Sequence, residues 1–401
     1  MERSELVAEE ENKKEKSCFQ KYLELIKNFT IKNFLPISLI VAVVFGVLVP
    51  QPGVALNHKA TLYVCVIGIF LYSGLYLRTD ALKEVVKAYK AALWGILSIL
   101  AFTSIIGGNL TMLLGFNEEY VGKFNQSTTN SSSNSSLQNN LSSSISLNQN
   151  FTGTKYKHGL GPAEFKVGLL VFFCMPCTIS SGVVMVTQLG GNFVLALILT
   201  VVANIAGVFT IPLFFKWFLT TVTDVNLDVL PLLLQLCLTL LLPLIFGKCL
   251  RFIKIIKDFV VVPRHKLVLK LISVTLLAVI TWLKVSKSSQ DGKLGQLTIT
   301  SAFFIIAWAL TMHSLFLILN TVASYILKLT TEERKCIIIL ASQKTLAVAI
   351  PTITFLPESL GDQGLMAIAM VLCHLTMILF DAVLIPIWLR CEKQSNPDDE
   401  A

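Results

Sequence analysis

Long apolar stretches, separated by short polar or charged stretches, occupy most of this chain. Ten of them approach the roughly 20 residues that a helix needs to cross the hydrocarbon core of a bilayer. They lie at residues 35–50, 60–77, 91–115, 164–187, 193–215, 229–247, 267–285, 297–319, 336–355 and 365–389. The pattern therefore predicts an all-α integral membrane protein with ten transmembrane helices.

Composition supports a membrane protein and argues against several other classes. Of the 401 residues, 54% are hydrophobic and 14% are charged, and the mean hydropathy is +0.70. An ordinary soluble domain carries about 25% charged residues. HExxH, P-loop and GxSxG patterns are absent, and Cys174 and Cys177 form a CxxC without a second ligand pair. We expect no enzyme activity, no metal site and no cofactor. Because basic and aromatic residues do not interleave, we expect no nucleic-acid partner either.

Two of the apolar stretches contain residues that interrupt a helix. Residues 174–182 read Cys-Met-Pro-Cys-Thr-Ile-Ser-Ser-Gly, and residues 341–345 read Ala-Ser-Gln-Lys-Thr with Pro351 behind them. Freed backbone groups at membrane depth are tolerated where protein or a water-filled cavity receives them. Transporters build binding sites from such broken helices. We therefore predict broken helices at spans 4 and 9.

The matching positions of the two breaks predict how the chain is divided. Ten spans split into two groups of five, and two odd-numbered groups have opposite orientations, as in inverted-repeat transporters. We expect a first five-helix repeat at 34–215 and a second at 216–390. Residues 1–33 form a charged head, in which 19–34 has the composition of an interfacial helix, and 391–401 form a tail.

Basic residues predict the orientation in the membrane. The head, the tail and the loops on their side hold 22 Lys and Arg residues, whereas the opposite loops hold 9. The positive-inside rule then places both termini in the cytosol. The Ser/Asn-rich loop at 116–163 falls outside, and we expect it to be disordered and glycosylated. Its sequons are at Asn125, Asn130, Asn134, Asn140 and Asn150. We expect the plasma membrane as the location, with endoplasmic reticulum and Golgi as open alternatives.

Polar residues at membrane depth are the candidate binding residues. Lys344 lies near the middle of span 9, where a charge costs about 2.5–3.5 kcal/mol on insertion scales. The alternative is a lysine that reaches a membrane surface. Around it and around the other break we expect substrate or ion contacts from Pro176, Thr178, Ser180, Ser181, Ser342, Gln343 and Thr345.

Further polar residues lie in spans 5, 8 and 10. Thr200 and Asn204 share one helix face and could offer oxygen atoms to a cation, or form an interhelical hydrogen bond. Asp381 could pair with Lys344 or Lys270, or relay protons. His313 and His374 are interpreted as satisfied core histidines. Asn320 carries no specific signal.

These residues resemble the sodium/bile acid cotransporter superfamily, and within it the sodium/bile acid cotransporter 7 branch. The resemblance covers about residues 30–390. It rests on Cys174-Met175-Pro176, Ser180-Ser181-Gly182-Val183, Gly190-Gly191-Asn192, the segment 196–204 with its Thr200 and Asn204, Ser342-Gln343-Lys344-Thr345-Leu346 and Ile350-Pro351, with Gly74-Leu75 and Arg78 at the end of span 2.

The resemblance implies ten helices, and a panel domain beside a core domain in which spans 4 and 9 unwind and cross. Substrate and sodium sites would lie at that crossing. The chain departs from the family at two places. The glutamate expected before the polar segment of span 9 is replaced by the apolar residues 337–340, and Gly182 stands where the family has asparagine.

Two functional hypotheses follow. The first is a secondary transporter with alternating access, moving a small organic anion or an inorganic ion, with sodium or proton coupling left open. Membrane lipid surrounds it. The second is a non-transporting negative regulator of calcium influx that acts on a calcium-channel partner. A link to cellular calcium homeostasis is implied by the resemblance alone.

Overall fold

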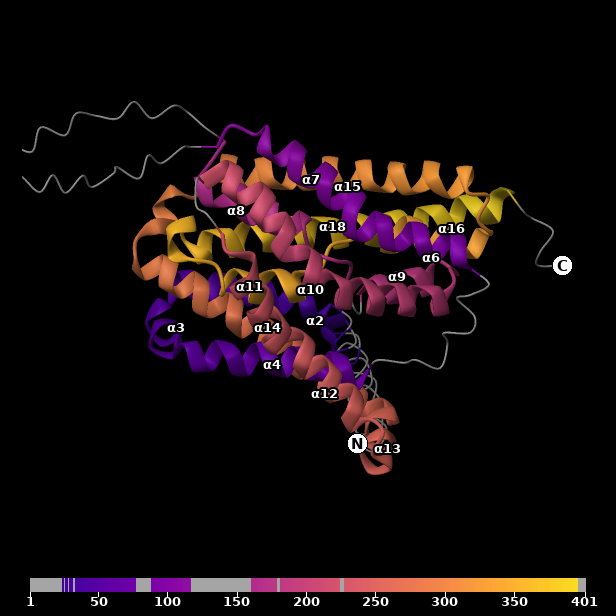
Figure 1. The fold of residues 1–401 in the computed structure, drawn as a ribbon, viewed down its shortest axis with the longest axis horizontal. Helices are drawn as coiled ribbons and strands as arrows, with labels where there is room; N and C mark the ends of the chain where they lie inside the picture. Colours follow the sequence, from indigo (N-terminus) through magenta and orange to yellow (C-terminus); the bar gives the residue numbers. More distant parts are fainter. Residues whose placement is uncertain are drawn as a thin grey trace, which may run out of the picture.

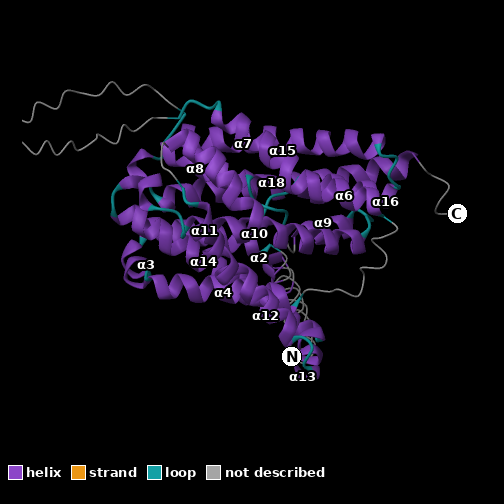
Figure 2. Cartoon of the chain, in the orientation of Figure 1, coloured by secondary structure: helices purple, strands orange, loops and turns teal. Residues whose placement is uncertain are grey.

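Helices form all the regular structure of the residues described by the computed structural model (Figure 1, Figure 2). These residues are 33–76, 88–116, 160–178, 181–223 and 227–395, with a few positions between 24 and 31. The five expected glycosylation sites, Ser180 and most of the expected interfacial segment at 19–34 lie outside them. The all-helical class predicted from hydropathy is confirmed.

One group of helices packs around α14. It comprises α2 (Phe34–Leu48), α3 (Pro50–Leu56), α4 (Lys59–Leu75), α11 (Val229–Leu236), the π-helical turn η2 (Cys237–Leu241), α12 (Leu242–Leu250), α13 (Lys254–Val261) and α14 (Pro263–Gln290). Within the group, α14 packs on α2, α3 and α4, and α12 packs on α4. Figure 1 shows α3, α4, α12 and α14 together along one side of the molecule.

A second group contains both interrupted segments. It comprises α6 (Tyr89–Leu97), the π-helical turn η1 (Ser98–Phe102), α7 (Thr103–Met112), α8 (Ala163–Phe173), α9 (Ser181–Gln188), α10 (Phe193–Thr223), α15 (Ile299–Ile326), α16 (Thr331–Leu340), α17 (Leu346–Ile353) and α18 (Gln363–Ser395), with short 3₁₀ turns η3 (Lys293–Gln296) and η4 (Glu358–Leu360). α18 packs against α8 and α15, and α14 reaches across to α17 and α18.

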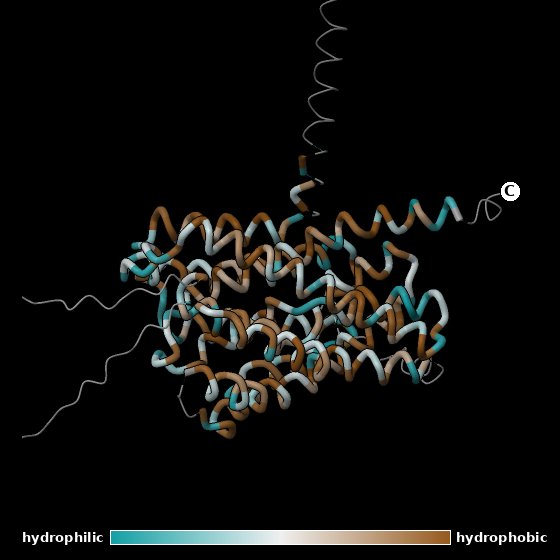
Figure 3. Tube along the Cα trace, turned by 90° about the horizontal axis from the view of Figure 1, so that it is seen from above, coloured by the Kyte–Doolittle hydropathy of each residue, from teal (hydrophilic) through white to brown (hydrophobic). Residues whose placement is uncertain are grey.

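Length and composition make several of these helices able to cross a membrane. Among the described residues, six helices are long and apolar enough, or seven when α2 and α3 are joined across their 102° bend. Brown, apolar positions follow the sides of the helical body, and many of the teal, polar positions lie at its two ends (Figure 3). This distribution is typical of a multi-pass membrane protein.

Close contact between helices depends on small residues, as in other membrane bundles. A Cβ at Gly74 would collide with the backbone carbonyl of Leu244, and a Cβ at Gly247 would collide with that of Leu71. The two glycines therefore allow the backbones of α4 and α12 to touch. Larger apolar side chains, such as Phe165 and Phe172, fill the interior of the second group.

The observed helices lie at the predicted spans, but several of them are longer than predicted. Each expected range contains helix, but α10, α15 and α18 extend up to eight residues beyond the ranges read from hydropathy. The basic connection at 248–266, between two predicted spans, contains a helix that the hydropathy pattern did not predict, α13. Its alternating basic and apolar residues lower the average hydropathy without preventing a short amphipathic helix.

Candidate functional site

The first interruption separates α8 from α9. Pro176 has no backbone N–H, and α8 ends before it, at Phe173. Thr178 then caps the following helix, because the N–H of Gly182 donates to its Oγ1 at 2.8 Å. This hydrogen bond satisfies one of the donors that every helix start leaves free. Residues within the buried segment 174–178 thus keep it in a non-helical conformation.

The second interruption separates α16 from α17 and is built in a similar way. α16 begins at a capping box formed by Thr330 and Glu333. It ends at Leu340, and the buried residues 341–345 follow in a non-helical conformation. Thr345 caps α17 by accepting the N–H of Ala347 at 3.2 Å. A threonine hydroxyl therefore accepts a backbone N–H from the first turn of the second helix in each interrupted segment.

Hydrogen bonds join the two interruptions directly. The backbone N–H of Thr345 donates to the carbonyl of Pro176 at 2.9 Å. The hydroxyl of Thr178 donates to Oε1 of Gln343 at 2.7 Å. Residues 165 positions apart in the chain thus meet inside the protein. Pro176, Thr178, Gln343 and Thr345, four of the residues singled out from the sequence, lie together.

The contact between Thr178 and Gln343 requires a glycine at position 182. A Cβ at this position would lie 2.5 Å from Oγ1 of Thr178, 2.7 Å from Cδ1 of Leu340 and 3.0 Å from Oε1 of Gln343. The first two distances are shorter than real Cβ contacts, and the third is tighter than most of them. The absence of a side chain at Gly182 therefore leaves the space in which Thr178 and Gln343 meet.

Lys344 is fully buried, so the alternative of a lysine reaching the membrane surface is wrong. Its Nζ donates to the carbonyl of Ile99 at 3.0 Å and to Oγ of Ser104 at 3.2 Å. Ile99 belongs to η1, where the π-helical turn changes the hydrogen-bond register of the helix. The lysine therefore ties the second interruption to the helix that runs from α6 to α7.

Asp381 has a different partner from the two lysines expected. Its Oδ1 lies 2.7 Å from Nε2 of His313, and its Oδ2 accepts from Nε2 of Gln343 at 2.6 Å. Both the aspartate and the histidine are fully buried. The predicted pairing of Asp381 with Lys344 or Lys270 is therefore wrong in this conformation. The side chain of Asp381 on α18 instead contacts α15 and the second interruption.

A short hydrogen bond joins His313 and Asp381. Nδ1 of His313 faces the carbonyl of Ser342 at 3.2 Å, and a carbonyl can only accept, so Nδ1 carries hydrogen. The 2.7 Å contact between Nε2 and Oδ1 then needs a second proton, on the ring or on the carboxyl. His313 is satisfied, as expected, but it also belongs to the polar network around Gln343. Sequence reasoning missed that role, because nothing in the sequence links spans 8 and 10.

Asn320 also supports the second interruption, although no signal marked it in the sequence. It is fully buried in α15, and its Nδ2 donates to Oγ of Ser342 at 3.0 Å. Its Oδ1 accepts from Ser98 at 2.7 Å and from Trp94 at 3.1 Å. One amide thus connects the 341–345 segment with α6 and η1.

Thr200 and Asn204 lie beside the first interruption. Nδ2 of Asn204 donates to the carbonyl of Cys177 at 3.2 Å and to that of Thr200 at 2.7 Å. Oδ1 of Asn204 is buried and has no hydrogen-bond partner among the described residues. An unpartnered buried oxygen is uncommon, and a cation is one of the groups that can satisfy it. The hydrogen-bonding alternative is observed for the amide nitrogen of Asn204. A cation contact from Thr200 and Asn204 stays a prediction.

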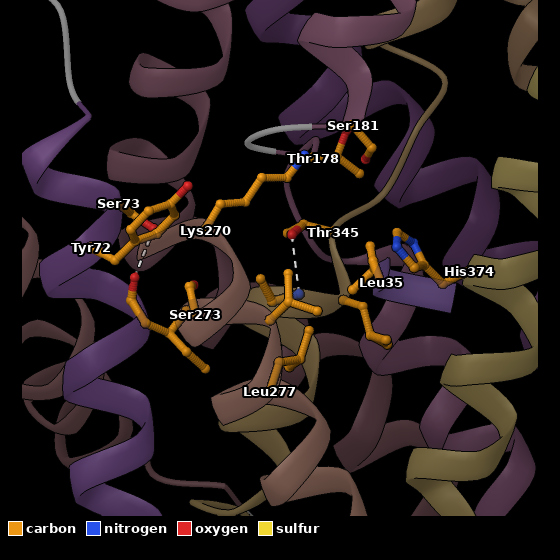
Figure 4. A pocket seen from close by; sticks show the side chains of 14 residues that line it. Leu35, Tyr72, Ser73, Thr178, Ser181, Lys270, Ser273, Leu277, Thr345 and His374 are labelled. Carbon is orange, nitrogen blue, oxygen red and sulfur yellow. Dashed lines mark hydrogen bonds between the residues drawn. The ribbon is translucent and has the colours of Figure 1, made fainter. Parts of the chain in front are cut away.

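A small pocket lies between the α14 group and the two interruptions (Figure 4). Its volume is about 70 Å³. Its polar lining consists of Tyr72, Ser73, Thr178, Ser181, Lys270, Ser273, Thr345 and His374, and its apolar lining of Leu35, Ile69, Val274, Leu277, Leu346 and Ala347. Thr178, Ser181 and Thr345 were among the predicted binding residues.

Lys270 supplies the positive charge of this pocket. It extends from α14 toward Thr178 and Ser181 (Figure 4). Lys344, by contrast, is not part of the pocket lining. From the sequence, Lys270 is predicted only as a possible partner of Asp381. Its position inside an apolar span was the signal that could have placed it among the binding residues.

His374 connects the pocket to the second interruption. Its Nδ1 lies 3.1 Å from the carbonyl of Lys344, so this nitrogen carries hydrogen. The ring meets Phe172 edge to face, with 6.1 Å between ring centroids. His313 and His374 thus each satisfy one carbonyl freed by the unwinding of 341–345. That pairing explains why two histidines are buried in otherwise apolar helices.

Buried interrupted helices that meet beside a pocket, in a bundle of membrane-spanning length, define a membrane transport protein. Comparison with known proteins then identifies the family. Residues 33–390 match the model of the SBF-like CPA transporter family, and the chain belongs to this family. The resemblance to the bile acid cotransporter superfamily is confirmed, and the relatives are transporters rather than enzymes.

Named relatives come from plants and animals. The probable sodium/metabolite cotransporter BASS4, chloroplastic, of Arabidopsis thaliana is 30% identical over 379 residues, covering 92% of this chain and 75% of that protein. The protein of the same name from Oryza sativa subsp. japonica is 30% identical over 380 residues, covering 91% and 78%. Sodium/bile acid cotransporter 7 of Danio rerio is 23% identical over 377 residues, covering 88% and 93%.

Proposed function

We propose that this protein is a secondary transporter that carries a small organic anion by alternating access around the meeting point of the two interrupted segments. The observation that supports this most is the pocket between α14 and the interruptions, with Lys270 at its wall. A site between two helix groups can open to either side when one group moves against the other.

The span count supports the ten-helix plan. To the six long apolar helices can be added the bent pair α2 and α3, and the 17-residue α4. The pairs α8 with α9 and α16 with α17 are each split by their interruption, so that neither half reaches spanning length. Counting each pair as one span gives ten. We propose that they form two inverted repeats, at 34–215 and 216–390, with both termini cytosolic.

The pocket favours an anion. Lys270 contributes a positive charge, and Ser181, Leu346 and Ala347 bring the first residues of α9 and α17 to its wall. Helix N-termini carry partial positive charge and favour anionic groups. Hydroxyl groups in the lining can donate to a carboxylate or an oxyanion. A volume of about 70 Å³ is well below the roughly 300 Å³ at which drug-sized ligand pockets begin, so we expect a compact solute.

Sodium is the coupling ion that we propose. The relatives are named as sodium cotransporters. The unpartnered Oδ1 of Asn204 belongs to a side chain that contacts the first interruption at Cys177. Oxygen atoms are the ligands that hard cations require. Proton coupling through His313 and Asp381 is the alternative. A plasma-membrane location, glycosylation in 116–163 and a role in calcium homeostasis remain predictions from the sequence.

Uptake into proteoliposomes tests the proposal. Purified protein is reconstituted and supplied with radiolabelled small carboxylates, with and without an inward sodium gradient. We expect sodium-dependent accumulation of at least one of them. Lys270→Gln should raise KM about 10- to 100-fold, because a hydrogen bond to a charged group is worth about 1.5–3 kcal/mol. Lys270→Arg should retain part of the affinity.

Lys287→Gln is the matched control. Lys287 lies on the same helix as Lys270, and its side chain is half exposed and pairs with Glu358 at 3.8 Å. Its loss should leave KM unchanged. An unaltered KM for Lys270→Gln would exclude the anion-binding role of Lys270. If no solute moves, while the protein still changes calcium entry in cells, the non-transporting regulator is favoured instead.

A further inference from the structure

The segment that joins α12 to α14 has an exposed apolar face that the transport mechanism does not use. α13 begins four residues after α12 ends and finishes two residues before α14 begins. Ile255 is 80% exposed and Phe259 is 49% exposed. The two side chains lie four positions apart, and therefore on one side of the helix. Figure 1 shows α13 projecting from the helical body at the end of α12.

α13 is held in place despite its small area of contact. Val260 is only 4% exposed. The ring of His265 stacks on that of Phe259, with centroids 4.0 Å apart, and Nδ1 of His265 lies 3.1 Å from the carbonyl of Phe259. These contacts tie α13 to the start of α14. The exposed apolar side chains are therefore presented by a fixed helix.

Basic residues surround this apolar face. Residues 248–266 contain six Lys or Arg residues and one acidic residue, Asp258. Lys254, Lys257 and Arg264 are exposed. Since spanning helices lead into α13 and out of it, the segment lies where the bilayer meets water. A short helix with apolar and basic faces at that depth fits the headgroup region of an anionic membrane.

A second observation extends this surface along α14. A shallow apolar groove of about 260 Å³ is lined by Val268, Leu271, Ile272, Thr275 and Leu276. Arg264 precedes Val268 by four residues and Ile272 by eight, so it lies at the head of the same helix face. From Val268 to Leu276 the groove runs about 12 Å along the helix axis, at 1.5 Å per residue. That length accommodates part of an acyl chain.

We propose that α13 and the exposed face of α14 form a binding site for an anionic phospholipid. Lys254, Lys257 and Arg264 contact the phosphate and its acidic headgroup, and one acyl chain occupies the groove at Val268 and Ile272. The opposite face of α14 carries Lys270, which lines the internal pocket. The lipid site stands on its own geometry and does not depend on transport.

Native mass spectrometry of the purified full-length protein tests the site. The protein is titrated with phosphatidylglycerol and with phosphatidylcholine of the same chain length. Wild type should retain phosphatidylglycerol in preference to phosphatidylcholine. Lys254→Gln combined with Arg264→Gln should weaken phosphatidylglycerol binding about thirtyfold, which corresponds to about fivefold for each charge near an anionic headgroup. Ile272→Ser should weaken binding of both lipids.

Lys90→Gln combined with Lys328→Gln is the charge-matched control, because both lysines are exposed and lie outside this segment. It should bind phosphatidylglycerol as wild type does. Thermal unfolding checks that each variant is folded. Equal retention of the two lipids by wild type, or unchanged binding by the α13 variant, overturns the proposal. If soluble glycerol phosphate binds as tightly as the lipid, the site recognises an anion rather than a phospholipid, and the proposal is overturned. If the protein forms a dimer that Ile272→Ser abolishes, this face binds a second copy of the chain, and the proposal is overturned as well.

Discussion

At the scale of single residues, the fully buried Lys344 and the partly buried Lys270 have different tasks. The ammonium group of Lys344 donates hydrogen bonds to Ile99 and Ser104 within the protein. Lys270 lines the pocket. The sequence marked Lys344 clearly, because it stands among polar residues within an apolar span. It could not show that the side chain points to η1, since a π-helical turn leaves no reliable pattern in the sequence.

Gly182 gives a sharp test at this scale. Gly182→Ala places a methyl group against Thr178 and Leu340. We expect it to separate Thr178 from Gln343, to lower the stability by about 1–3 kcal/mol and to reduce uptake at least tenfold. The melting temperature in detergent and the uptake rate are the two measurements.

Gly115→Ala is its control, because no heavy atom lies within 4 Å of a Cβ built at Gly115. That variant should behave as wild type. If Gly182→Ala has the melting temperature and the uptake rate of wild type, the close packing at the first interruption is needed neither for stability nor for transport.

At the scale of elements, each interruption is stabilised by a cap within its own segment and by contacts from other helices. Thr178 and Thr345 were predicted from the sequence as binding residues, and the structure adds that they cap α9 and α17. The supporting contacts from Asn320, His313 and His374 could not be predicted, because single polar residues in different spans do not reveal which of them meet. Similarly, the basic character of 248–266 concealed α13, since a hydropathy average weighs charge and ignores periodicity.

A substitution at Asn320 tests whether contacts from other helices stabilise the second interruption. Asn320→Ala removes the acceptor for Trp94 and Ser98 and the donor to Ser342. Leaving buried polar groups without partners costs about 1–3 kcal/mol each. We therefore expect a clear fall in melting temperature.

Asn109→Ala is the matched control, since Asn109 is exposed and, among the described residues, its side chain bonds to Ile105 in its own helix. It should change the melting temperature little. Equal melting temperatures for the two variants would show that Asn320 does not hold the second interruption.

At the scale of the whole molecule, hydropathy predicted the all-helical membrane class and the position of nearly every helix. It predicted less well where helices end, because polar residues at the ends of α10, α15 and α18 continue the helix beyond the apolar core. The pocket could not be predicted, since it depends on how α14 lies against the interruptions. The family match connects these features to transport, and the geometry suggests where the solute binds.

The central claim is that transport depends on the meeting point of the two interrupted segments, and Lys344→Ala tests it most directly. The measurement is sodium-driven solute uptake by proteoliposomes that contain equal amounts of folded wild type, Lys344→Ala and the surface control Lys90→Ala. We predict uptake by wild type and the control, and none above background by Lys344→Ala. Uptake by Lys344→Ala at the wild-type rate would contradict the account.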